Sequence, residues 1–163
     1  MPEAISKASG IKHTAYSLLP AAIHSHSFYL LSLMSSRQNI LTGSPWEDKV
    51  GYCRAVRIGN LIEVAGTVAI VDGETVKADD AYAQTKNIIE RIGKVLEDAG
   101  ASLSDVVRTR MFTTDINRFD EIGRAHGEFF KDIKPVTAIY EISRLVSPDY
   151  LIEIEFTAVV GEL

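Results

Sequence analysis

The sequence holds little of what several classes of protein depend on. A single cysteine, Cys53, stands among its 163 residues, which excludes an intrachain disulfide or a cysteine zinc cluster and fits a reducing compartment. No apolar run approaches the roughly 18 residues that span a bilayer. The 17 basic residues are outnumbered by 22 acidic ones, and the net charge of −5 disfavours broad affinity for phosphate backbones. We therefore expect a soluble, cytoplasmic protein that binds neither membranes nor nucleic acid.

The remaining composition, 46% hydrophobic and 24% charged, is ordinary for one globular domain. Residues 1–45 differ from the rest, because they are rich in Ser and Ala and show no well-organised amphipathic period. We interpret 1–45 as an extension or irregular N-terminal segment and 46–163 as the folded domain. For residues 1–33 we favour an upstream extension over a targeting segment. His24 and His26 are interpreted as part of a polar loop, and no metal is expected there.

From residue 51 onward, apolar residues recur at regular spacings. A period of two predicts strands, helical spacing predicts two helices, and Gly59-Asn60 predicts the tight turn of a hairpin. The order strand, strand, helix, strand, helix, strand, strand predicts an α+β fold, with two helices on one face of a mixed sheet. Four of the five predicted strands cover Cys53–Ile58, Leu61–Val71, Val106–Thr114 and Ile152–Phe156, and the remaining strand lies between Pro135 and Ile152. The predicted helices cover residues 81–99 and a segment that has Asn117 as its N-cap and ends before Pro135.

The closing strand places Glu153 and Glu155 on one face and apolar residues on the other. That face is no ordinary apolar core, because a buried unpaired carboxylate costs several kcal/mol or changes its pKa. It therefore meets either water or a polar site. Arg108 and Arg110 project from the same face if both strands point the same way, so the face is a candidate subunit interface. We expect Glu155 to pair with one of these arginines.

Several short segments occur together in a specific order, although each alone is a weak signal. They are GYCRAV at 51–56, Gly59-Asn60, VAGT at 64–67, Gln84, GASLSDVV at 100–107 and the closing IEIE. Over roughly residues 45–160 the chain resembles the Rid family, also called YjgF/YER057c/UK114. The resemblance implies a fold similar to Bacillus chorismate mutase and a homotrimer with a central barrel and ligand clefts between subunits. It also implies hydrolysis of enamine or imine intermediates to a 2-oxo acid and ammonia, without a cofactor.

One departure from the family pattern affects the expected activity. In the active deaminases an arginine two residues after a proline holds the substrate carboxylate. The matching residue here is Thr137, after Pro135, and Ile139 replaces a common cysteine. A hydroxyl supplies no charge, so an anionic substrate would lose about 2–3 kcal/mol, or roughly 30- to 150-fold in affinity. The chain therefore resembles a branch without the deaminase arginine, and we hypothesise that Arg54 or Arg144 restores the cationic contact.

Other positions keep the family pattern. Glu153 matches the glutamate thought to position or activate the hydrolytic water. Gly66 keeps the glycine whose backbone lies near the ligand, and Tyr52 matches a tyrosine at the cleft. Ala65 stands where many members carry serine, and Thr67 replaces a frequent glutamine. We predict Glu153 as the catalytic residue, and as substrate-binding residues Tyr52, Ala65, Gly66, Thr67, Thr137 and Ile139.

Three functions follow from this resemblance. The first is a Rid-family trimer that binds a small metabolite and, if it is an enzyme, hydrolyses imines as 2-iminobutanoate/2-iminopropanoate deaminases do. The alternative, which Thr137 favours, is a non-catalytic ligand-binding or regulatory protein. The third is the endoribonuclease (L-PSP) or translation-inhibitor activity attached to family names. The acidic balance and the absence of an aromatic-basic stripe count against this third function.

Overall fold

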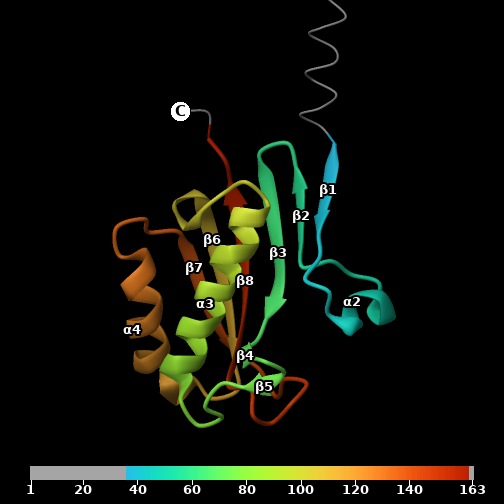
Figure 1. Ribbon diagram of the computed structural model, residues 1–163. Helices are drawn as coiled ribbons and strands as arrows, with labels where there is room; N and C mark the ends of the chain where they lie inside the picture. The colour runs from blue at the N-terminus through green and yellow to red at the C-terminus, as the bar shows by residue number, and fades with distance from the viewer. Residues whose placement is uncertain (1–35, 162–163) are drawn as a thin grey trace, which may run out of the picture. The chain divides into compact units, whose positions relative to one another are not determined.

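A six-stranded sheet with the strand order β1-β2-β3-β8-β6-β7 forms the centre of the computed structural model, which describes residues 36–161 (Figure 1). Neighbouring strands are antiparallel except β6 and β7, which are parallel, so the sheet is mixed as predicted. The strands are β1 (Arg37–Ile40), β2 (Ala55–Ile58), β3 (Leu61–Thr67), β6 (Val106–Thr113), β7 (Val136–Glu141) and β8 (Ile152–Val159).

Two helices, α3 (Ala81–Asp98) and α4 (Phe119–Phe130), lie on one face of the sheet (Figure 1). Helix α3 packs against β8 and β3, and α4 packs against α3. The first turn of α3 is capped by Asp80, whose carboxylate accepts a hydrogen bond from the Ala83 N–H at 2.8 Å. The predicted α+β fold is confirmed. Shorter elements are α2 (Pro45–Val50), β4 (Ile70–Val71), β5 (Glu74–Thr75), η1 (Leu103–Asp105) and η2 (Ile116–Arg118).

The core fills the space between these helices and the inner face of the sheet. Ile88 and Ile92 of α3 are fully buried, as are Ile152 and Ile154 of β8. Burying one such side chain contributes about 1.5–3 kcal/mol relative to leaving it exposed. The apolar residues that alternate along β8 are therefore those that pack into this core. The same alternation directs the Glu153 side chain to the opposite face of the sheet.

Strand β1 begins before the boundary that the sequence pattern placed at residue 45. Arg37–Ile40 pairs with Ala55–Ile58, and Ile40 is 6% exposed while the three residues before it are exposed. The strand therefore forms through its main-chain pairing with β2. Because only one of its side chains is buried, the sequence shows no alternation of apolar and polar residues there. The extension expected over residues 1–33, with His24 and His26, lies outside the described residues.

Within residues 36–161, no helix combines the length and apolarity needed to cross a membrane. The same residues hold no group of three or more His, Cys, Asp or Glu side chains arranged to bind a metal ion. Cys53 is half-buried and its thiol is free.

The loop between β1 and α2 is held by a buried carboxylate. Glu47 is 4% exposed and accepts hydrogen bonds from the Thr42 N–H (3.1 Å), the Thr42 hydroxyl (2.9 Å) and the Gly43 N–H (3.1 Å). Burial raises the pKa of Glu47, but these hydrogen bonds and the charge of Arg54 outweigh burial and leave the pKa lowered. The ionised form of Glu47 therefore stabilises the fold.

We expect Glu47→Gln to lower the free energy of unfolding at pH 7 by about 2 kcal/mol, because charge-assisted hydrogen bonds are lost. A carboxyl group whose pKa is lowered by folding stabilises above its ordinary pKa of 4.5, and this contribution disappears as the pH falls through the folded pKa. Urea denaturation at pH 7, 5 and 3 should show the deficit shrinking with acidity. Asp48→Asn, in the exposed neighbour, is the control. A deficit independent of pH would contradict the assignment.

Candidate functional site

A cavity of about 350 Å³ lies where β3 ends and the chain leaves the sheet. Its wall combines residues from the segment before β2, the last residues of β3 and those that follow them, Arg91 of α3, and the loop that leads into the start of β8. This size is at the lower end of the range for small-molecule sites in proteins. The polar residues that line the cavity include Thr42, Ser44, Tyr52, Arg54, Thr67, Arg91, Tyr150 and Glu153, and Gly66 lies among them.

The Arg54 side chain connects three parts of this wall. Its Nη1 donates to the Gly66 carbonyl oxygen at 2.7 Å and to Thr67 Oγ1 at 3.3 Å, and its Nη2 donates to Tyr52 Oη at 3.0 Å. The pairing of β3 with β8 is irregular between Val64 and Thr67. Arg54 therefore binds β3 at the point where the regular ladder is interrupted, and the guanidinium orientation is fixed from two sides.

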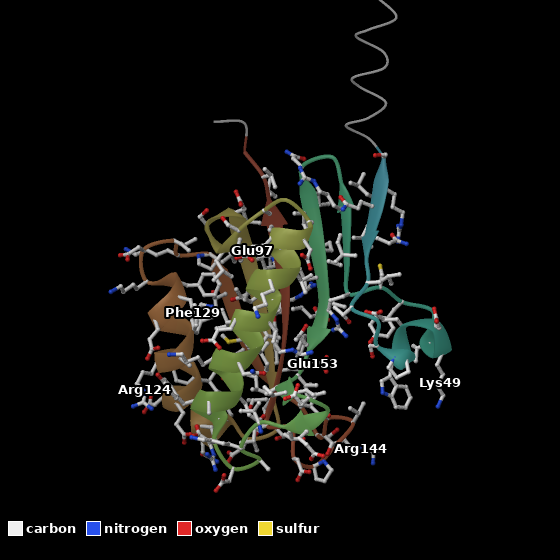
Figure 2. All side chains as sticks on the ribbon, viewed as in Figure 1. Lys49, Glu97, Arg124, Phe129, Arg144 and Glu153 are labelled. Carbon is white, nitrogen blue, oxygen red and sulfur yellow. The ribbon has the colours of Figure 1, made fainter. Side chains whose placement is uncertain are left out.

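Glu153 enters the cavity from β8 and depends on a glycine beside it. A Cβ atom built on Gly66 would lie 2.8 Å from the Glu153 carboxyl carbon, closer than real Cβ contacts. A larger residue than glycine would therefore displace the carboxylate. Glu153 also borders an open groove of about 900 Å³ that Arg144 lines, and Figure 2 shows both residues at this end of the sheet.

The surroundings of Glu153 favour its protonated form. Burial raises the pKa of Glu153, the charge of Glu155 acts in the same direction, and the charge of Arg54 opposes both. The net pKa lies above the ordinary glutamate value of 4.5. A carboxylate with a raised pKa is a stronger proton acceptor than a solvated one, as a general base requires.

Some lining residues were not predicted from the sequence. Arg91 reaches the cavity from α3 and donates through Nη1 to the Val68 carbonyl oxygen. Burial lowers the pKa of Arg91, and the positive charge of Arg54 lowers it further. Trp46 from α2 and Tyr150 from the loop before β8 complete an aromatic wall. The sequence carries no signal for them, because each side chain reaches the cavity only through tertiary packing.

Thr137 lies on β7 and is bonded within its own chain. Its hydroxyl donates to the Pro135 carbonyl oxygen at 3.1 Å and lies 3.0 Å from Thr109 Oγ1, which is 3.1 Å from His126 Nε2. Burial lowers the pKa of His126. These contacts place the Thr137 hydroxyl on the sheet face that α4 covers. Neither Thr137 nor the neighbouring Ile139 lines the cavity.

The predicted site residues thus separate into two groups. Tyr52, Gly66, Thr67 and Glu153 line one cavity. Ala65 lies just outside this lining, and its carbonyl oxygen accepts a hydrogen bond from Thr67 Oγ1 at 2.9 Å. Strand β6 separates β7, which carries Thr137 and Ile139, from β8. One chain by itself does not bring the two groups together.

The sheet face opposite the helices carries both charge and apolar surface. Glu155 pairs with Arg110 at 2.9 Å, as the sequence predicted. Phe112 stacks on Tyr140 with ring centroids 5.8 Å apart, and Val136 is 63% exposed. An apolar patch beside an ion pair is typical of a protein interface.

Comparison with known proteins identifies the family. The sequence model of the family described as Endoribonuclease L-PSP matches residues 45–160. A solved structure from Mycobacterium tuberculosis, a member of the YjgF/YER057c/UK114 family, is 46% identical and aligns with a TM-score of 0.71 over 77% of this chain and 100% of that chain. The chain belongs to the Rid (YjgF/YER057c/UK114) family.

Two curated Rid relatives extend this comparison. A RutC family protein of Pyrococcus abyssi is 43% identical over 109 residues, which cover 66% of this chain and 84% of that protein. The 3-aminoacrylate deaminase RutC of Acinetobacter baylyi is 33% identical over 108 residues, which cover 66% of this chain and 85% of that protein.

We expect Gly66→Ala to displace the Glu153 carboxylate while the fold is kept. The added Cβ meets the end of a flexible side chain, so the free energy of unfolding should change by less than about 1 kcal/mol. The control is Gly123→Ala on α4, where a Cβ meets nothing within 4 Å and should stabilise the helix by about 0.5–1 kcal/mol. Crystal structures and urea denaturation of both variants test this. An unmoved Glu153 carboxylate in Gly66→Ala would refute it.

Proposed function

We propose that this Rid-family chain is a hydrolase that deaminates a small imine or enamine, releasing a 2-oxo acid and ammonia. The observation that carries the proposal is Glu153, a half-buried carboxylate with a raised pKa, held beside Gly66 in a cavity of metabolite size. The Acinetobacter baylyi relative is named for the deamination of 3-aminoacrylate, and an imine or enamine acid is a substrate of the same chemical class.

Glu153 acts on the attacking water in this proposal. Its ionised carboxylate accepts a proton from the water as the water oxygen bonds to the imine carbon. The nitrogen takes up a proton, the C–N bond breaks, and ammonia leaves as the new carbonyl forms. The substrate loses nitrogen and gains oxygen, so no oxidant or reductant is consumed. Gly66 contributes by leaving room for the carboxylate, and Tyr52 contributes through its hydrogen bond with Arg54 in the cavity wall.

We propose that the working form is a homotrimer with its ligand clefts between subunits. The family positions on β7, Thr137 and Ile139, lie apart from the cavity within one chain, so a site that uses both groups needs a second copy. The exposed face with the Phe112 and Tyr140 stack supplies an apolar surface for that contact. In this proposal the open faces of the three sheets form a central barrel.

One observation favours a second candidate, a non-catalytic ligand-binding protein. Thr137, at the position of the deaminase arginine, directs its hydroxyl to Pro135 and Thr109 of its own chain. We propose that the chain belongs to a Rid branch that lacks this arginine. Such a branch needs another cationic group to retain an anionic substrate.

Hydrolysis of enzymatically generated 2-iminopropanoate and 2-iminobutanoate tests the proposed reaction. We expect the wild type to accelerate ammonia release and Glu153→Gln to lose about 100-fold or more, because the proton acceptor is removed. The activity should fall as the pH decreases through a midpoint above 4.5, since only the ionised carboxylate accepts the proton. Glu97→Gln, which removes an exposed carboxylate on α3, serves as the control and should retain the activity.

The same assay distinguishes the second candidate. If the wild type is inert and Thr137→Arg gains activity, the chain is a binding protein toward these two imines. An active Glu153→Gln variant would contradict the role proposed for the carboxylate.

A further inference from the structure

We infer that Arg54 and Arg91 form an anion site in the cavity, which holds the carboxylate of a small ligand in the absence of an arginine at position 137. The inference rests on the proposed function only for the location of the ligand. Beyond the proposed function, this inference assigns the residues that bind the ligand and the charge that the ligand carries.

The first support is the charge balance of the cavity wall. Arg54 and Arg91 line the same cavity, and the single carboxylate in that lining is Glu153. Among residues 36–161, neither arginine lies within 4.0 Å of a carboxylate oxygen. Within the lining, two guanidinium groups face one carboxylate, because the Glu47 carboxylate, which also interacts with the charge of Arg54, lies outside the lining and is hydrogen-bonded to Thr42 and Gly43. Charges in a partly buried site interact more strongly than in bulk water, so the wall attracts an anion.

The second support is the set of hydrogen-bond donors left over. Arg54 donates hydrogen bonds to Gly66, Thr67 and Tyr52. These bonds occupy its Nη1 and one N–H of its Nη2. Its Nε is buried and has no partner in the part of the chain that the structure describes. A guanidinium carries five N–H donors, so one N–H of Nη2 remains for a ligand, whereas Nε is buried away from the surface. Because the group is already fixed, little side-chain entropy is lost when it binds an anion.

Arg91 supplies the second half of the site. Its side chain donates a hydrogen bond from Nη1 to the Val68 carbonyl oxygen, and its remaining N–H donors are left for a ligand. Burial and the charge of Arg54 both lower the pKa of Arg91. A nearby anion would relieve the second of these two effects. Arg144, the other arginine that the sequence pointed to, is exposed and lines the open groove instead.

The rest of the wall indicates the kind of anion. A volume of about 350 Å³ fits a small metabolite. Trp46, Tyr52 and Tyr150 offer flat apolar surface that suits a short conjugated body. The Glu153 carboxylate disfavours a second negative charge beside it. The ligand class is therefore a small monocarboxylate with a planar neighbouring group, such as a 2-oxo or 2-imino acid.

Calorimetric titration of the full chain tests this site without measuring hydrolysis. The probes are 2-oxobutanoate and its neutral analogue 2-oxobutanamide. The variants are Arg91→Gln and Arg54→Gln, and the control is Arg124→Gln, which removes an exposed charge on α4 that lies over the Tyr82 ring. We expect the wild type to bind the carboxylate at least tenfold more tightly than the amide. Arg91→Gln should weaken carboxylate binding by about tenfold or more and leave amide binding unchanged.

The outcomes separate this inference from the proposed reaction. A wild type that binds 2-oxobutanoate through the arginines but hydrolyses no imine supports the anion site and rejects the hydrolase. Arg54 also holds β3, so if Arg54→Gln fails to fold, the result of Arg91→Gln decides. The inference is overturned if the wild type binds neither probe, if it binds both equally, or if Arg91→Gln binds the carboxylate as tightly as Arg124→Gln.

Discussion

The contact between the Arg54 guanidinium and the end of β3 is the interaction on which the cavity depends. It joins the segment that leads into β2 to the irregular last residues of β3, through Gly66, Thr67 and Tyr52. The main chain of Arg54 is also bonded on both sides, to Ile40 and to β3. A single residue thus fixes two sides of the wall and brings its own charge into the cavity.

Glu153 lies in the same cavity as the Arg54 charge, and opposing influences on the carboxyl group set its pKa. Burial and Glu155 favour the protonated carboxyl group, while Arg54 favours the ionised one. Gly66 permits the approach, because a side chain there would overlap the carboxylate. The arginine that organises the wall therefore also keeps the carboxylate available as a base, which connects the local fold of β3 with the proposed reaction.

Elements that follow from periodic residue patterns or local turn signals could be predicted from the sequence. Features that depend on single tertiary contacts could not. The alternation in β8 and the Gly59-Asn60 turn follow from local rules, and both are present. The N-cap predicted at Asn117 was wrong by one residue: a 3-10 turn capped by Asp115 precedes α4, whose N-cap is Arg118. Local capping rules do not distinguish a 3-10 turn from the first turn of a helix.

The candidate site divides in the same way. Glu153, Gly66 and Tyr52 were found through the family pattern, whereas Arg91 was not, because its contact with Val68 exists only once α3 has packed on the sheet. Thr137 matches a family position in sequence, yet its hydroxyl is bonded to its own chain. A motif therefore locates a position without giving the direction of its side chain.

The most direct test of this account is a carbon-13 NMR titration of the Glu153 carboxyl group in the wild type and in folded Arg54→Gln. The account predicts a wild-type pKa above 4.5 that rises further when Arg54 is removed, because the opposing positive charge is lost. A wild-type pKa at or below 4.5, or a pKa that does not respond to the loss of Arg54, would contradict it.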